Sequence, residues 1–133
     1  MARRRRKALC LDAVPPEVLV LTAGADIQQD RIEVSCTGWT KDDDMRVLAR
    51  DVIWGSPTEN ETWAELDDAL KRYFRHPHGG VLNVGAAIIE SGDWADQVYA
   101  FCRPRAERRM LAGKGMPGFG RPSLAFSESR NAR

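Results

Sequence analysis

The chain has 133 residues, of which 43% are hydrophobic and 29% charged, and its formal net charge is +1. That length fits one domain with a single hydrophobic core, and the composition is typical of a soluble globular protein, which excludes a disordered chain and a membrane-spanning one. Cys10, Cys36 and Cys102 lie far apart with no Cys-x-x-Cys, so the sequence predicts neither a disulfide framework nor a zinc site.

Charge is unevenly distributed along the chain. Residues 3–7 are all basic and arginines recur over the last third, whereas acidic residues gather between residues 42 and 68. The basic start resembles that of a secretory signal, but Asp12 interrupts the residues that follow, so the apolar core of a signal is missing. We therefore expect a cytoplasmic protein whose residues 1–13 form a flexible basic leader.

Three strands are predicted first. An extended connector with two prolines at residues 14–17 leads into an apolar run at 18–26, which predicts the first strand. Apolar and polar side chains alternate across residues 32–37, which is typical of a half-exposed second strand. A run of mixed polarity at residues 45–54 predicts the third.

Helices and further strands alternate after that. Apolar side chains recur at helical spacing over residues 59–75, and Thr58 with Glu61 predicts a capping box at the start of this helix. Residues 81–89 are apolar at nearly every position, which is typical of a central strand covered on both faces.

A second helix is predicted at about residues 93–103, capped from residues 91–93 and ended by Pro104. Residues 110–112 predict a short last strand. We expect residues 123–133 to form a disordered tail.

The order of these elements is that of a ribonuclease H-like α/β fold, with a mixed sheet in which three antiparallel strands precede helix-crossed parallel ones, and flanking helices. In that topology the first and fourth strands are adjacent and parallel, so their carboxyl ends meet where open α/β sheets usually bind ligands. Asp26 closes the first of these strands and Glu90 the fourth. Two carboxylates at neighbouring strand ends can share a hard divalent cation, so the sequence predicts a metal site there.

Each of these acidic residues also has a purely structural interpretation. Asp26 is placed where an aspartate can accept hydrogen bonds from turn amides, and Glu90 where it can interact with the dipole of the following helix. Asp30 suits a turn or an ion pair with Arg31, and Asp93 suits a helix N-cap more than a third ligand.

An ordered series of short motifs runs through the chain. The most specific is Leu-Thr-Ala-Gly-Ala-Asp-Ile-Gln-Gln-Asp-Arg at residues 21–31. Others follow in order: Val52-Ile53-Trp54-Gly55, Ala86-Ala87-Ile88-Ile89-Glu90-Ser91-Gly92, Val98-Tyr99-x-Phe101-Cys102-Arg103 and Lys114-Gly115. Through these motifs residues 14–122 resemble the nuclease domain of the phage terminase large subunit, lambda-type (the GpA family), whose first motif is close to Leu-Thr-Ala-Gly-Val-Asp-Val-Gln-x-Asp-Arg.

The resemblance implies a function and a site. In that family a metal-dependent endonuclease nicks concatenated viral DNA to make genome ends. By resemblance, Asp26 is the first catalytic and metal-binding acid and Glu90 the second, where the family usually has Asp, and they hold one or two Mg²⁺ or Mn²⁺ ions. Arg109, Lys114 and Arg121 are the residues that we expect along the DNA phosphates.

The resemblance also implies partners: double-stranded DNA, the terminase ATPase domain, the small terminase subunit and the portal, in the cytoplasm of a host bacterium and without a membrane. Two features depart from the family. The chain has no Gly-x-x-x-x-Gly-Lys-[Ser/Thr] phosphate loop of the packaging motor, and Glu128 is its only acid near the place of the family's third metal ligand. We therefore expect residues 14–122 to form a nuclease domain lacking its C-terminal part.

The alternative is a truncated, catalytically inactive module that binds DNA or serves packaging assembly. A different ribonuclease H-like enzyme, such as a resolvase or transposase, would also need a final acid that the sequence does not supply.

Overall fold

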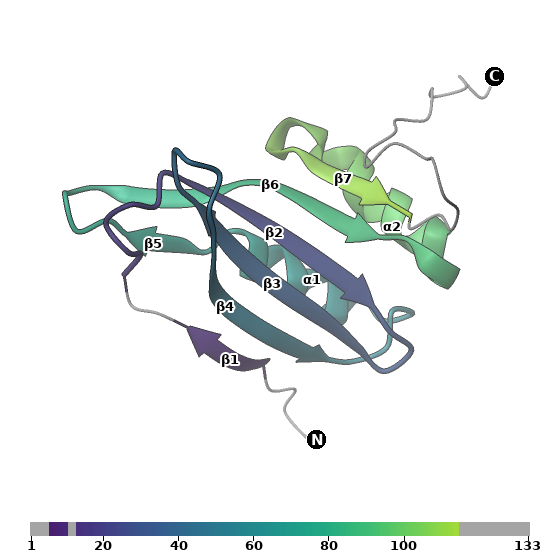
Figure 1. The fold of residues 1–133 in the computed structure, drawn as a ribbon. Coiled ribbons are helices and arrows are strands. Elements are labelled where there is room, and N and C mark those ends of the chain that lie inside the picture. Colours follow the sequence, from purple (N-terminus) through teal and green to yellow (C-terminus); the bar gives the residue numbers. More distant parts are fainter. Residues whose placement is uncertain (1–5, 11–12, 115–133) are drawn as a thin grey trace, which may run out of the picture.

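A mixed sheet with helices on one side organises the molecule (Figure 1). The computed structural model describes residues 6–10 and 13–114, and within them the sheet has seven strands. The strands are β1 (Arg6–Cys10), β2 (Val20–Ile27), β3 (Arg31–Trp39), β4 (Met45–Trp54), β5 (Tyr73–Arg75), β6 (Val81–Glu90) and β7 (Met110–Gly113). The helical segments are α1 (Asn60–Leu70), the 3-10 turn η1 (Gly92–Trp94), α2 (Ala95–Cys102) and the 3-10 segment η2 (Arg103–Arg108).

The strand order is β1-β4-β3-β2-β6, and both β5 and β7 pair with β6. The pairs β1–β4, β4–β3, β3–β2 and β5–β6 are antiparallel, whereas β2–β6 and β6–β7 are parallel. β5 pairs with residues 81–83 of β6 and β7 with residues 87–90, so residues 84–86 lie between the two partners on the same edge of β6. The expected adjacency of β2 and β6 is confirmed.

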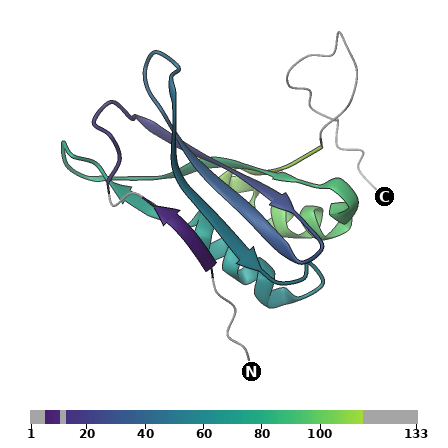
Figure 2. The ribbon, with the colours of Figure 1, turned by 60° about the horizontal axis from the view of Figure 1, so that its bottom comes forward.

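One face of the sheet packs on the helices. Leu21, Ala23, Ala25 and Ile27 alternate along β2 on that face and are buried, because side chains of a strand point to opposite faces in turn. α1 and α2 contribute the other half of the core through buried side chains, which are Leu66, Ala69, Leu70, Val98 and Phe101. Figure 2 shows both helices below the sheet, so the opposite side, here called the open face, is uncovered within the described residues.

Two of the three cysteines are packed in the core. Cys36 and Cys102 are buried, and burial raises the pKa of the Cys102 thiol to about 11, which keeps it protonated and unreactive. The side chain of Cys10 lies outside the described part. Within the residues described, no helix is both long and apolar enough to cross a membrane.

Some boundaries differ from those predicted. The third strand is confirmed at its predicted limits, but the helix predicted over residues 59–75 ends at Leu70. The residues after it form β5, where Phe74 is buried and Tyr73 is exposed, because pairing with β6 replaced the last helical turn. The predicted capping box is wrong, since Glu59 is the N-cap, without a side-chain cap, and the Thr58 hydroxyl is 2.8 Å from that of Ser56.

Two further expectations on single elements are wrong. β6 is not covered on both faces, because Ile89 is buried but Ile88 is 47% exposed on the open face. Ser91 to Asp93 do not cap the second helix, which has Trp94 as N-cap without a side-chain cap. The predicted end of this helix at Pro104 is confirmed, because α2 ends at Cys102 and Pro104 belongs to the 3-10 segment η2. η2 tolerates Pro104 because a proline at the first helical positions lacks only an N–H that would be unpaired anyway.

The chain ends also differ in part. Residues 6–10 of the predicted flexible leader form β1, which pairs with β4 at the edge of the sheet. Backbone pairing therefore orders this part of the leader. The predicted tail at 123–133 lies outside the described residues.

A buried ion pair joins β4 to the end of α1. Nη2 of Arg72 is 2.7 Å from Oδ2 of Asp51, and the two side chains are 15% and 4% exposed. Oδ1 of Asp51 is buried and has no hydrogen-bond partner among the described residues. Arg72 compensates the charge of the buried Asp51 carboxylate, so removal of either partner alone should lower the stability of the fold.

We therefore expect Arg72→Met to lower the free energy of unfolding by about 3 kcal/mol, because it leaves a buried carboxylate without its counter-charge. Urea unfolding followed by circular dichroism measures the change. Arg103→Met, at an exposed position, is the matched control and should cost less than about 0.5 kcal/mol. The double variant Asp51→Leu/Arg72→Met should regain most of the loss; equal costs for Arg72→Met and Arg103→Met would contradict the role of the pair.

Candidate functional site

Asp26 and Glu90 lie side by side at the carboxyl ends of two parallel strands. The register of β2 and β6 pairs Ala25 with Ile89 and Asp26 with Glu90. Neighbouring strands are about 4.8 Å apart, and directly paired residues project to the same face. Because Ala25 and Ile89 face the core, the two carboxylates project from the open face, where Asp26 is half-buried and Glu90 exposed. The predicted proximity is confirmed, whereas the catalytic role stays a prediction.

Glu33 is a third carboxylate in the same row. β3 lies on the other side of β2, and its register pairs Glu33 directly with Asp26. The row therefore runs Glu33, Asp26, Glu90 over three adjacent strands. Sequence reasoning missed Glu33, which it treated as one of the polar positions of an alternating strand. The short turn predicted between the first two strands was the signal that could have placed Glu33 opposite Asp26.

Like charges directly opposite one another in a sheet are destabilising, so this row needs compensation. Arg31 supplies part of it, because its Nη1 is 2.8 Å from Oδ1 of Asp30 and its Nε is 3.7 Å from Oε1 of Glu33. The Arg31 guanidinium also lies 5.9 Å from the centroid of the Trp54 ring. Asp30 thus pairs with Arg31, as its structural interpretation predicted.

Gln28 orients the central carboxylate of the row. Its Nε2 donates a hydrogen bond of 2.7 Å to Oδ2 of Asp26. The backbone N–H of Gln28 is used in the turn, where it donates to the carbonyl of Arg31 at 2.8 Å. Asp26 is therefore held by a side-chain amide that engages one of its two oxygens.

The donor set suits a hard cation that keeps part of its own hydration. Mg²⁺ is usually bound by one or two carboxylates together with waters and substrate phosphates. Asp26 and Glu90 provide two such carboxylates on an open surface. In the described part of the chain, no group of three or more His, Cys, Asp or Glu is placed to hold a metal together. The row can therefore supply a partial coordination shell and no complete cage.

The predicted DNA-binding residues separate into three cases. Gly113 of β7 pairs with Glu90, and Lys114 is the next residue, so the lysine lies close to the Glu90 end of the carboxylate row. Arg109 directly precedes the first residue of β7, so it lies about 13 Å from Gly113 at 3.3 Å per residue. Its backbone is left-handed, with φ 56°. Arg121 lies outside the described residues.

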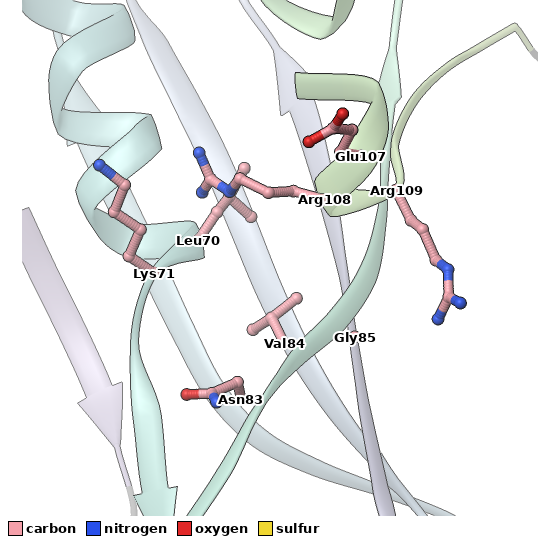
Figure 3. Close-up of a pocket in the computed structure, with 8 residues that line it drawn as sticks. All are labelled: Leu70, Lys71, Asn83, Val84, Gly85, Glu107, Arg108 and Arg109. Atoms are coloured by element: carbon pink, nitrogen blue, oxygen red, sulfur yellow. The ribbon is translucent and has the colours of Figure 1, made fainter. Parts of the chain in front are cut away.

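A cavity of about 320 Å³ opens at the edge of β6, between β5 and β7 (Figure 3). The end of α1, the middle of β6 and the end of η2 line it, and its polar side chains are Lys71, Asn83, Glu107, Arg108 and Arg109. Sequence reasoning named only Arg109 of these. Three segments far apart in the chain form the cavity, so no local pattern signals it.

Asp67 of α1 contacts three cations in and beside this cavity. Its Oδ1 accepts hydrogen bonds of 2.9 Å from Nε of Arg105 and 2.5 Å from Nη1 of Arg108, and its Oδ2 is 3.0 Å from Nζ of Lys71. Burial alone would raise the pKa of Asp67, but the hydrogen bonds from these three cations outweigh burial and lower the pKa below its usual range.

Asp67→Asn should lower the free energy of unfolding at pH 7 by about 2 kcal/mol, because hydrogen bonds to a charged carboxylate are lost. The lowered folded-state pKa means that this stability is fully present above the ordinary value of 3.8 and is lost as the pH falls below it. The gap between wild type and variant, measured by urea unfolding, should therefore shrink from pH 7 to about pH 2.5.

The exposed neighbour Asp68 offers a control on the same helix, and Asp68→Asn should change stability by less than about 0.5 kcal/mol. A gap for Asp67→Asn that is independent of pH would show that the carboxylate charge is not what stabilises the contact.

Comparison with known proteins gives the chain its relatives. A family model described as terminase large subunit gpA, endonuclease domain, matches residues 1–133. The chain is 30% identical over 122 residues to the terminase large subunit of Enterobacteria phage P21, which covers 91% of the chain and 19% of that protein. It is 26% identical over 119 residues to the terminase large subunit of Escherichia phage lambda, covering 89% of the chain and 19% of that protein.

The chain thus spans about a fifth of the length of the curated relatives it matches. No solved structure matches it.

Proposed function

Because the chain belongs to the family of terminase large subunit gpA endonuclease domains, we propose that it is a divalent-metal-dependent endodeoxyribonuclease that nicks concatemeric viral DNA during genome packaging. The observation that carries this proposal is the register that pairs Asp26 with Glu90 at the ends of two parallel strands. Both are assigned as catalytic and metal-binding residues.

A ribonuclease H-like core is part of the proposal. Its support is the strand order β4-β3-β2-β6-β7, in which the first three strands of that core are antiparallel and β2, β6 and β7 are parallel. α1 lies between β4 and β6 in the chain, and α2 between β6 and β7. This is the arrangement that brings the ends of the first and fourth core strands together.

The reaction is the hydrolysis of a phosphodiester, in which water attacks phosphorus and the sugar oxygen leaves. One or two Mg²⁺ or Mn²⁺ ions, when bound, would supply activation of that water and stabilisation of the leaving oxygen. Asp26 and Glu90 would hold such ions by one carboxylate each, and Gln28 fixes the orientation of Asp26 through the 2.7 Å hydrogen bond.

The substrate approaches from the open face, because α1 and α2 cover the other side of the sheet. Lys114 follows the strand partner of Glu90 and is exposed, so its ammonium group can contact a phosphate next to the one that is cut. Arg31 keeps part of the negative charge of the row balanced while the site is without substrate.

The partners follow from the same premise. The proposal includes double-stranded DNA as substrate, and the terminase ATPase domain, the small terminase subunit and the portal as assembly partners, in the host bacterial cytoplasm. The phosphate loop of a motor is missing from this chain, so ATP-driven movement of DNA is assigned to another part of the machine.

The second candidate function is a module that binds DNA or takes part in packaging assembly without cutting. One observation favours it: the described residues supply no third side chain placed to complete a metal site. The two candidates differ in what Asp26 is for, because a binding module keeps its function without this carboxylate.

A nicking assay on supercoiled plasmid distinguishes them. We expect nicking in Mn²⁺ or Mg²⁺ and none in chelator, and Asp26→Asn and Glu90→Gln should each lower the rate at least about 100-fold, because even outer-shell metal partners are worth about 10- to 100-fold. Asp96→Asn, the same chemical change at an exposed position of α2, is the matched control and should nick at the wild-type rate.

Absence of nicking by a folded wild-type chain in either metal would favour the binding module. Metal-dependent nicking that survives Asp26→Asn would place the reaction at other residues.

A further inference from the structure

The cavity at the β6 edge sits where the sheet is interrupted. Residues 84–86 of β6 face neither β5 nor β7, and the cavity occupies this interval, bounded by the end of α1 on one side and the end of η2 on the other. Figure 3 shows the Arg108 side chain crossing from η2 toward α1, where the Lys71 side chain also lies, with Asn83 below them. Two cations from two elements thus lie at the end of α1, and the Asn83 amide lies apart from them.

Positive charge exceeds negative charge around this cavity. Lys71, Arg105 and Arg108 all contact the single carboxylate of Asp67, so three cations share one anion. Glu107 adds a second carboxylate to the lining, and Arg109 adds a fourth cation. The balance favours an anionic occupant.

Arg108 has an unused donor group. Its Nη1 is engaged by Asp67, whereas its Nη2 is buried and has no hydrogen-bond partner among the described residues. A buried donor without a partner costs about 1–3 kcal/mol, and a ligand oxygen would remove that cost once the guanidinium turns toward the cavity. The guanidinium keeps its positive charge at any working pH, which suits a phosphate.

We propose that this cavity binds a backbone phosphate of a DNA strand, through the Arg108 guanidinium and the Lys71 ammonium group. The inference rests on the proposed function for the identity of its ligand. Glu90 lies five positions after Gly85 of the cavity, which is about 16 Å along β6. The bound phosphate is therefore several nucleotides from the one that is cut, so the cavity anchors the duplex and takes no part in the chemistry.

Arg109 points away from the two cations of this anchor. Figure 3 shows its side chain pointing away from α1, opposite to that of Arg108. The left-handed backbone of Arg109, with φ 56°, is what sends the two consecutive arginines to different sides of the β6 edge. A strand held at the cavity thus meets a further cation, Arg109, on its way to the carboxylate row.

Binding of a fluorescent DNA duplex, followed by anisotropy in chelator at several salt concentrations, tests the proposal without cleavage. Lys71→Gln should weaken binding about 5- to 10-fold and reduce the slope of log K against log salt by about 1, because one phosphate contact is lost. Arg108→Gln should do the same. Lys41→Gln, the same charge change at an exposed position in the β3–β4 turn, is the matched control and should bind like wild type.

The Lys71 side chain is 59% exposed, so its replacement leaves the fold intact even if Arg108→Gln proves unstable. Lys71→Gln with the affinity and salt slope of wild type would overturn the proposal, and so would absence of DNA binding by the folded wild-type chain. Competition with inorganic phosphate at constant ionic strength distinguishes a DNA phosphate from free phosphate as the ligand. The proposal expects inorganic phosphate to displace little of the duplex, whereas complete displacement would identify a site for free phosphate.

The outcome is independent of the nuclease assignment. Asp26→Asn should retain wild-type binding in chelator, because it leaves the cavity unchanged. If the chain nicks no DNA but Lys71→Gln weakens binding, the nuclease assignment fails and the cavity stands. If nicking is normal and Lys71→Gln alters neither KM nor binding, the cavity fails and the nuclease assignment stands.

Discussion

The parallel pairing of β2 with β6 is the constraint on which the site depends. Its register places Asp26 beside Glu90, and the antiparallel pairing of β2 with β3 adds Glu33 to the same row. A shift of one residue in either pairing would turn one carboxylate toward the helices, because side chains alternate between the two faces. The apolar neighbours Ala25 and Ile89 prevent that shift, since they are buried against α1 and α2 and would have to become exposed.

The same sheet separates two kinds of charge. The open face gathers three carboxylates, which repel one another unless a cation lies among them, while the β6 edge gathers cations around Asp67. Arg31 offsets the row only at its Glu33 end. Such a division would suit the proposed enzyme, whose substrate is a polyanion: the acidic row would hold a metal where a phosphate is cut, and the basic edge would hold the strand beside it.

Sequence reasoning located Asp26 and Glu90 because each closes an apolar run, and strand order then predicted that the runs are neighbours. It missed Glu33, because this residue joins the row only through the register of β2 and β3. It extended α1 through Tyr73 and Phe74, because two aromatic residues fit a helix and a strand equally and only the free edge of β6 decides. The cavity stayed hidden for a related reason: Lys71, Asn83 and Arg108 belong to three separate segments, and no spacing in the chain relates them.

The central claim is that Asp26 and Glu90 share a divalent cation. Anomalous diffraction from crystals grown with Mn²⁺ tests it most directly, because the scattering identifies the metal and its position together. We predict a peak on the open face within about 2.2 Å of an oxygen from each of these two carboxylates, a normal bond length for hard divalent ions. Full occupancy of Mn²⁺ elsewhere, or a carboxylate row that stays without metal at saturating Mn²⁺, would contradict the account.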